Sequence, residues 1–408
     1  NSASLTMDAG SGDWIAGETA TVTLTDADMN KYPESSETLS IGDEDALIPT
    51  IKMGSPLTLA NSDGNNNLAA SATNSTQGVT VGHGTGMNEY ALTVYNTSDH
   101  SERLRIVHNA MEDGIGYGVS AGSKIGGSQM SHTWINVTTA HTLTDLVNLA
   151  GTAVLNYDVS GPAGDLSSTA VAVYVLGGGY NTTNSADIGA VTSGNARSGV
   201  VDLDDGSTYW IKSSDVTSVQ TFGPGQSQGT GATNVGVAFK ITHAVGTYLN
   251  ATADYAIAAD FCNFDQDNGS NVHNCIYRIE AEETGDNTGV FEGSVSYVML
   301  NNSTAAESTG DGQHAGNDEE VEAFLDGYTN TDEVQVVIMN GVSGSDAIRV
   351  VYNDTDALQA ADKIGAQLDT LTHSGTASLD ADTYEADDMA TITIVDADLN
   401  QDSSIRDT

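Results

Sequence analysis

The chain has 408 residues, of which 56 are Asp or Glu and 12 are Lys or Arg, so its formal net charge at pH 7 is −44. This balance excludes nucleic acid as a partner, because binding phosphates needs Lys and Arg to replace condensed counterions; it also disfavours an anionic membrane surface and favours cations. A salt-adapted surface is the alternative explanation of the charge. The length predicts about two to four domains, and a hydrophobic content of 38% is enough for packed cores.

Alternating β-branched residues between clusters of Gly, Asn and Asp predict half-buried strands along the whole chain. In chain order, the clearest are Thr19–Thr25, Ala91–Tyr95, Leu104–His108, Ala170–Leu176, Asn234–Thr242, Cys275–Ala281, Ser294–Leu300, Val334–Met339 and Ala347–Tyr352. Helices are predicted at three places only, His141–Ala150, Asp318–Leu325 and Ala357–Leu368. Many short strands with little helix predict an all-β fold of tandem immunoglobulin-like β-sandwich domains.

An internal repeat marks the organisation of the chain. Residues 20–30 (Ala-Thr-Val-Thr-Leu-Thr-Asp-Ala-Asp-Met-Asn) recur as residues 390–400 (Ala-Thr-Ile-Thr-Ile-Val-Asp-Ala-Asp-Leu-Asn). The likeness extends backwards to residues 3–5 and 377–379 after a shift of four positions. Each module is therefore expected to open with an alternating strand that ends in Asp-x-Asp-x-Asn.

A second pair of similar segments indicates where modules close. Leu104–Asn109 and Ile348–Asn353 share an aliphatic strand with Arg at its second position. The predicted domains are an Ig-like sandwich at 1–120, a β-rich domain of uncertain type at 121–235, an Ig-like sandwich at 236–370 and the start of a further module at 371–408. We expect an excerpt of a longer chain, because the sequence starts without Met and stops just after a strand-like run. It has no apolar run of about 18 residues, so no membrane insertion is expected.

The repeat residues resemble a known family. Residues 23–30, residues 283–293 (Glu-Thr-Gly-Asp-Asn-Thr-Gly-Val-Phe-Glu-Gly) and residues 348–354 together are similar to surface-layer proteins of ammonia-oxidising archaea of the Nitrosopumilus type. The resemblance implies many consecutive Ig-like modules in a longer chain. It also implies self-assembly into a porous two-dimensional lattice around the cell, commonly with hexagonal symmetry. The region at about 121–235 departs from the repeat pattern.

Three segments carry oxygen-bearing side chains that are typical of a calcium site. Spacing by two residues on an extended or turning backbone puts alternate oxygens on one side, where a hard cation can gather them. None is an EF-hand, because the required Gly and Glu are missing. The alternative is that Asp and Asn end a strand and hydrogen-bond their own turn. The candidate ligands of Ca²⁺, or of another divalent cation, are Asp26, Asp28 and Asn30; Asp396, Asp398 and Asn400; and Asp265, Asp267 and Asn271.

Cysteine and asparagine patterns indicate an extracellular protein. Cys262 and Cys275 are the only cysteines, and their short separation predicts a disulfide in an exported protein. The alternative is two reduced, buried thiols in a cytosolic protein. The Asn-x-Ser/Thr pattern of glycosylation acceptors occurs at Asn74, Asn96, Asn136, Asn181, Asn250, Asn268, Asn301, Asn302 and Asn353.

Two enzyme-like motifs lack the context that catalysis needs. Residues 118–122 fit the Gly-x-Ser-x-Gly elbow of hydrolases, but the preceding segment is polar and Gly-rich rather than a buried strand. His83-Gly84-Thr85 is similar to the His motif of subtilisin-like proteases, without a matching nucleophile segment. We therefore predict no catalytic residue, no organic cofactor and no enzyme activity. The enzyme-class alternative is an acidic extracellular hydrolase that uses Ser120.

Taken with the resemblance, these features predict a structural surface-layer subunit whose main partner is itself. The expected roles are a permeability barrier and an acidic layer that concentrates cations, ammonium among them, at the cell surface. The alternative is an Ig-like cell-surface adhesin or stalk with the same modules.

Overall fold

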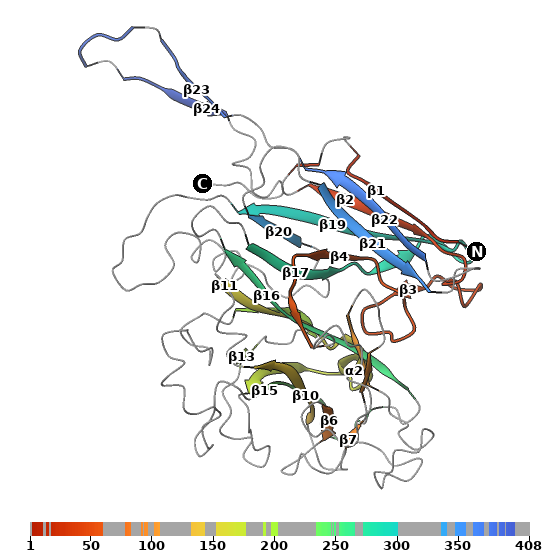
Figure 1. Ribbon diagram of the computed structural model, residues 1–408. Helices are drawn as coiled ribbons and strands as arrows, with labels where there is room; N and C mark the ends of the chain where they lie inside the picture. Colours follow the sequence, from red (N-terminus) through yellow and green to blue (C-terminus); the bar gives the residue numbers. More distant parts are fainter. Residues whose placement is uncertain are drawn as a thin grey trace, which may run out of the picture.

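The structure is a computed structural model (Figure 1). It describes residues 2–10, 14–15, 18–59, 78–82, 91–92, 94–96, 102–106, 132–142, 152–176, 191–192, 197–202, 234–245, 247, 249, 253–265, 272–300, 336–340, 347–355, 362–370, 375–381, 383–387 and 389–395. The fold is all-β, as the sequence predicts, and the described residues form four sheets that are mostly antiparallel. The one helix among these residues is α2 (Ser160–Asp165).

The first sheet, here called the N-terminal sheet, joins the start of the chain to segments almost 300 residues later. Its order is β1-β2-β19-β18-β3, with β20 parallel to β19. The strands are β1 (Ser4–Asp8), β2 (Thr19–Thr25), β3 (Thr38–Leu39), β18 (Ala281–Glu283), β19 (Val290–Leu300) and β20 (Val336–Asn340). β2 and β19 pair antiparallel from Thr25 opposite Val290 to Thr19 opposite Ser296.

The second sheet, the central sheet, has the order β14-β11-β16-β17-β4-β21-β22, and β5, β8 and β9 extend it. Its strands are β4 (Thr50–Met53), β5 (Leu57–Thr58), β8 (Val94–Asn96), β9 (Leu104–Ile106), β11 (Thr152–Asp158), β14 (Ser198–Asp202), β16 (Tyr255–Asp265), β17 (Val272–Arg278), β21 (Ala347–Asp354) and β22 (Asp362–Asp369). One edge of β16 pairs with β11. Its other edge pairs in turn with β17, β5 and β9.

The third sheet, the lower sheet in Figure 1, has the order β13-β12-β15-β10-β6-β7. Its strands are β6 (Gly78–Gly82), β7 (Ala91–Leu92), β10 (His132–Thr142), β12 (Ala170–Leu176), β13 (Val191–Thr192) and β15 (Asn234–Thr242). The fourth sheet is a hairpin of β23 (Thr376–Leu379) and β24 (Ile392–Val395).

β16 is buried on both faces, and this places the central sheet between two cores (Figure 1). Ala258 and Cys262 belong to cores that include residues of the N-terminal sheet. Ile257 and Phe261 belong to the core shared with the lower sheet and α2. Because successive side chains of a strand point to opposite faces, one apolar strand serves both cores, and residues 255–263 are all buried. The three large sheets therefore stack as layers.

Strand pairing crosses the module borders that the sequence suggests. β2, from the segment expected as module 1–120, pairs with β19 from the segment 236–370. β11, from 121–235, pairs along its whole length with β16. The physical reason is that a strand with two apolar faces needs layers on both sides, and distant segments supply them. The repeat marks two copies of a hairpin, and the domain limits stay a prediction. The Ig-like type of the sheets stays a prediction.

One helical prediction is wrong within the described residues. Ala357–Leu368 is rich in Ala and Leu, but its last part, residues 362–368, lies in strand β22 (Asp362–Asp369). Residues 363–369 alternate between exposed and half-buried side chains, and the strand pairs with β21 over eight positions. Tertiary pairing therefore overrides the helix propensity of these residues. The predicted helix Asp318–Leu325 lies outside the described residues, as do residues 143–150 of the other.

We predict that Phe261→Ala strongly destabilises the protein. Phe261 is fully buried between the central and lower sheets, and removing a buried phenyl group costs about 3–5 kcal/mol. The free energy of unfolding, measured by denaturant titration, should fall by this amount. The control Tyr32→Ala removes an aromatic side chain that is 68% exposed and should change it by about 0.5 kcal/mol or less. Equal effects of the two substitutions would contradict the layered core.

Candidate functional site

The Asp-x-Asp-x-Asn segment after β2 forms a hydrogen-bonded turn in its first copy. Asp26 is 2% exposed, and its Oδ1 accepts the N–H of Asp28 at 3.0 Å. Its Oδ2 accepts the hydroxyl of Tyr352 on β21 at 2.7 Å. Burial raises the pKa of Asp26, although both hydrogen bonds act to lower it. Asp26 therefore closes its own turn and connects the N-terminal sheet to the central sheet.

The hairpin loop between β18 and β19 packs against this turn. The backbone N–H of Asp26 donates to the carbonyl of Gly289 at 2.8 Å, and Asn30 Nδ2 donates to Asn287 Oδ1 at 3.0 Å. Gly289 has a φ of 61°, and a Cβ there would lie 3.0 Å from the Ala27 Cα. Both the left-handed backbone and the close approach favour glycine. The motif at 283–293 and the Asp-x-Asp-x-Asn motif are thus two halves of one contact.

Glu283 holds this loop closed from inside. Its Oε1 accepts the N–H groups of Thr288 and Gly289, each at 2.7 Å, and the Thr288 hydroxyl at 3.2 Å. Burial acts to raise the pKa of Glu283, but these donors outweigh burial and hold it below its usual value. The carboxylate is therefore ionised at neutral pH and acts as an acceptor for the loop backbone.

The described residues contain no group of three or more His, Cys, Asp or Glu side chains arranged to hold a metal ion. In the first copy of the motif, both oxygens of Asp26 already accept hydrogen bonds, and Asp28 is exposed. Two buried acceptors at the same contact, Asn30 Oδ1 and Glu283 Oε2, accept no hydrogen bond from any described residue. A cation or a water molecule bound at this contact would give these two oxygens a partner. Calcium binding stays a prediction.

The other candidate ligands cannot be compared in the same way. Asp396, Asp398 and Asn400 of the second copy lie outside the described residues, as do Asp267 and Asn271. Asp265 ends strand β16, opposite Val272 of β17.

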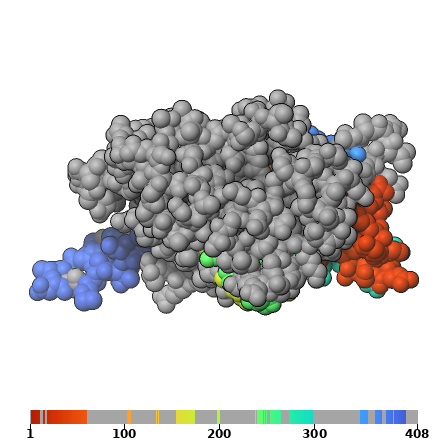
Figure 2. Space-filling model, turned by 90° about the horizontal axis from the view of Figure 1, so that it is seen from below, coloured from red at the N-terminus to blue at the C-terminus, as the bar shows by residue number. Residues whose placement is uncertain are grey.

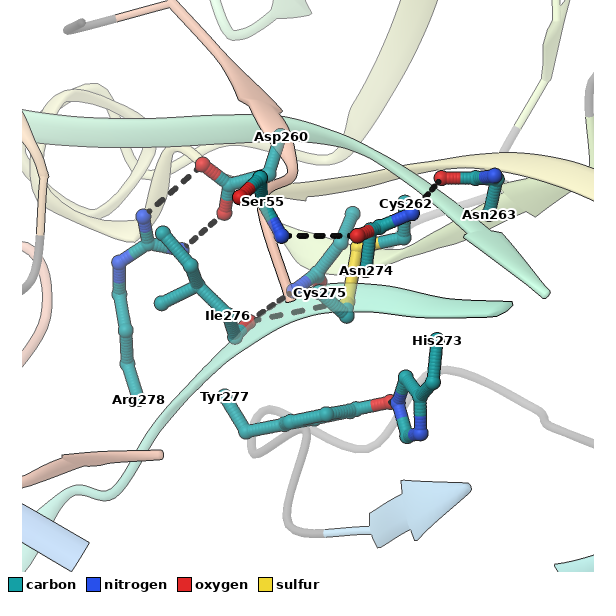
Figure 3. Close-up of a disulfide and its surroundings, with 11 residues drawn as sticks. Ser55, Asp260, Cys262, Asn263, His273, Asn274, Cys275, Ile276, Tyr277 and Arg278 are labelled. Carbon is teal, nitrogen blue, oxygen red and sulfur yellow. Dashed lines mark hydrogen bonds and ion pairs between the residues drawn. A yellow bond between two sulfur atoms is a disulfide. The ribbon is translucent and has the colours of Figure 1, made fainter. Parts of the chain in front are cut away.

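Cys262 on β16 and Cys275 on β17 are joined by a disulfide, and both are buried (Figure 3). The bond lies next to the point where the two strands separate. β17 pairs with β16 only over residues 272–274, and from Cys275 onwards it pairs with β4. The disulfide therefore joins the two strands directly beyond their last backbone-paired residues, Asn263 and Asn274.

A buried ion pair connects the same two strands beyond the disulfide (Figure 3). Arg278 Nη1 lies 2.5 Å from Asp260 Oδ2, and Arg278 Nη2 lies 3.1 Å from Asp260 Oδ1. Asn156 Nδ2 donates to the carbonyl of Ile276 at 3.0 Å. Such a pair specifies one arrangement of the strands, because removing either partner leaves an uncompensated buried charge.

Arg103 fixes the loop that follows β3. The residue is 1% exposed, and its guanidinium donates to the carbonyls of Ile41 at 2.7 Å and Asp43 at 2.8 Å, and to that of Ala46. Burial, together with the nearby charge of Arg278, lowers its pKa to about 10, so it stays protonated at neutral pH. The Arg103 guanidinium donates hydrogen bonds to backbone carbonyls of this loop, which would otherwise be buried without donors.

Asp158 ends β11 as a buried carboxyl group. Its Oδ1 accepts the N–H of Ser160 at 2.8 Å and the Ser160 hydroxyl at 2.6 Å at the start of α2, while Oδ2 accepts no hydrogen bond from the described residues. Burial raises its pKa to about 6. The sequence analysis missed Asp158, Asp260, Arg103 and Arg278. A charged residue inside an apolar run, as at Asp260, was the available signal.

Few of the predicted glycosylation acceptors can be placed. Asn353 is 8% exposed on β21, a poor position for a bulky glycan. Asn96 and Asn136 lie in strands β8 and β10. The other sequons, and the residues of the two enzyme-like motifs, are outside the described part of the chain.

Neither the models of known protein families nor the curated proteins give a match to this chain. The described residues contain no helix that is long and apolar enough to cross a membrane. Inference about function therefore depends on the chemistry and construction of the chain itself.

We predict that the disulfide contributes about 3 kcal/mol to stability, the value expected for a closed loop of this length. A reductant should lower the free energy of unfolding of the unchanged protein by about this amount. The double variant Cys262→Ala/Cys275→Ala should start at the lower value and be insensitive to reductant. Equal stability of all three forms would show that the disulfide does not connect the strands as described.

We predict that Asp158 makes stability fall as pH rises. Its pKa is raised from 3.8 to about 6 in the folded state, so the folded chain binds a proton that the unfolded chain has lost. Its contribution is present in full below about pH 4, falls between about pH 4 and 6, and is lost above, a change of at most about 3 kcal/mol. Asp158→Asn, which keeps the Oδ1 acceptor, should be more stable than the unchanged protein at pH 7 and equally stable at pH 4. A pH-independent difference in the unfolding free energies would contradict this assignment.

Proposed function

We propose that the protein is a structural subunit of an acidic surface layer that self-assembles on the outside of a cell and retains cations. The observation that carries this proposal is a net charge of −44 on an all-β chain with a repeated hairpin motif. The proposal includes no catalytic step. The resemblance of residues 23–30, 283–293 and 348–354 to surface-layer proteins of ammonia-oxidising archaea supports it.

The distribution of the carboxylates supports a role in holding cations. Among the Asp and Glu residues whose side chains the structure describes, six are buried, and the others are exposed or half-exposed. The buried ones are Asp26, Glu102, Asp158, Asp260, Glu283 and Asp354. Several of these have internal donors, as Asp260 has Arg278 and Glu283 has its loop backbone. Carboxylates at the surface face solvent and attract counterions from it.

The stacked sheets and the disulfide suit a structural role. Long-range strand pairing connects segments that are distant in the sequence, and a disulfide and a buried ion pair connect β16 to β17. A disulfide also fits an oxidising, extracellular location. These features would serve an adhesin or stalk equally well, so self-assembly separates the two functions.

Cation retention would act at short range. The Debye length is about 8 Å at physiological salt and about 3 Å at 1 M. An acidic layer therefore enriches cations only within pores or grooves of roughly nanometre width, and it excludes large anions from them. Charge of this kind does not distinguish ammonium from sodium, so ammonium enrichment would follow from ion exchange rather than from a selective site.

We predict that the purified protein forms ordered two-dimensional sheets with Ca²⁺ and that a chelator dissolves them, as seen by electron microscopy. Assembled sheets should take up ammonium and sodium about equally, with uptake that decreases as salt increases. Sheets whose carboxylates have been amidated serve as the control and should take up neither. Isolated rods with and without Ca²⁺ would favour the adhesin or stalk, and uptake unaffected by amidation would contradict cation retention.

A further inference from the structure

The hairpin of β23 and β24 carries an apolar face that none of the described residues covers. It extends away from the rest of the described chain (Figures 1 and 2), and all described residues from 375 to 395 are exposed. Leu379 pairs with Ile392, and Ala377 pairs with Ile394, so these four side chains lie on one face. Leu379, Ile392 and Ile394 are 57%, 66% and 65% exposed. A two-stranded hairpin of this kind is marginally stable in water without a further layer or strand.

The first copy of the same hairpin is fully integrated in the fold. In the repeat, Val22 and Leu24 of β2 correspond to Ile392 and Ile394 of β24, and they are 1% and 0% exposed. Trp14, which is fully buried, corresponds to Tyr384, which is 37% exposed. The second copy therefore has the side chains of a core, and no described residue buries them.

The first copy also shows which kind of strand covers this face of the hairpin. β2 pairs with β1 on one edge and with β19 on the other. Across the β2–β19 pair, Phe291 lies opposite Leu24 and Gly293 opposite Val22. Phe291 is completely buried. β24 pairs with β23 on one edge, and its other edge has no strand partner among the described residues.

We propose that the free edge of β24 binds an additional antiparallel strand of the β19 type. The partner is an extended segment with Phe, Gly and Val at alternate positions, as in Val-Phe-Glu-Gly-Ser-Val. Backbone hydrogen bonds to β24 provide affinity, and the alternating apolar side chains cover Ile392 and Ile394. The β19 strand of the same chain cannot serve, because β2 already pairs with it. This interaction surface does not depend on lattice assembly.

The test uses a fluorescent peptide with the sequence of residues 288–297 and the complete chain, in buffer with enough salt to screen the acidic surface. We expect fluorescence anisotropy to show one bound peptide per chain, because β2 is occupied and β24 is free. Ile392→Asn/Ile394→Asn should weaken binding by at least about tenfold, since both substitutions remove apolar side chains from the contact. These residues are exposed, so circular dichroism and thermal unfolding of the remaining chain should not change.

Two matched controls make the result specific. Thr393→Asn/Val395→Asn also introduces two Asn residues, but on the opposite face of β24, and should leave binding close to that of the unchanged protein. A peptide with Phe291→Asn and Val295→Asn keeps its net charge and should not bind. Absence of peptide binding, or equal loss in both protein variants, would overturn the proposal. Self-association of the chain that Ile392→Asn/Ile394→Asn abolishes, without peptide binding, would assign the face to a second copy and also overturn it.

Discussion

The burial of β16 on both faces is the constraint on which the rest of the fold depends. An apolar strand with one covered face would expose either Ile257 and Phe261 or Ala258 and Cys262 to water. Covering both faces requires a sheet on each side, and distant segments provide those sheets. The same arrangement explains the buried ion pair. Asp260 lies in this strand without access to water, so its charge needs the guanidinium of Arg278 as a partner. The disulfide lies next to this pair, where β17 leaves β16.

The local elements could be predicted from the sequence, and the pairing between them could not. Thr19–Thr25, Ala170–Leu176 and Asn234–Thr242 form strands with the predicted bounds, because alternation of β-branched residues depends only on neighbouring positions. Register and partner depend on which distant faces need covering. The pairing of β2 with β19, and the cluster around Asp260, therefore have no signal in a single local segment. For the same reason, the residues of the first Asp-x-Asp-x-Asn motif could be singled out, but not the contact of Asp26 with Tyr352.

Comparison of the two hairpin copies shows that local sequence determines the strand pairing, while packing against other segments determines burial. Both copies pair their two strands antiparallel, and both gather most of their aliphatic residues on one face, although Val395 of the second copy lies on the other face with Thr393. In one copy the aliphatic face is buried, and in the other it is exposed. Local sequence thus specifies the amphipathic hairpin, while burial depends on a further strand and sheet. The strand addition proposed for β24 would supply this further strand.

The central claim is that the beginning of the chain and the segment after residue 280 form one sheet. The most direct measurement is disulfide formation in the variant Thr21→Cys/Ser294→Cys, because these residues are cross-strand partners in the β2–β19 pair and such neighbours lie within disulfide range. Mass spectrometry of peptides from the oxidised monomer should show a complete intramolecular link between positions 21 and 294. Free thiols, or links between molecules only, would contradict the paired arrangement and return the two segments to separate modules.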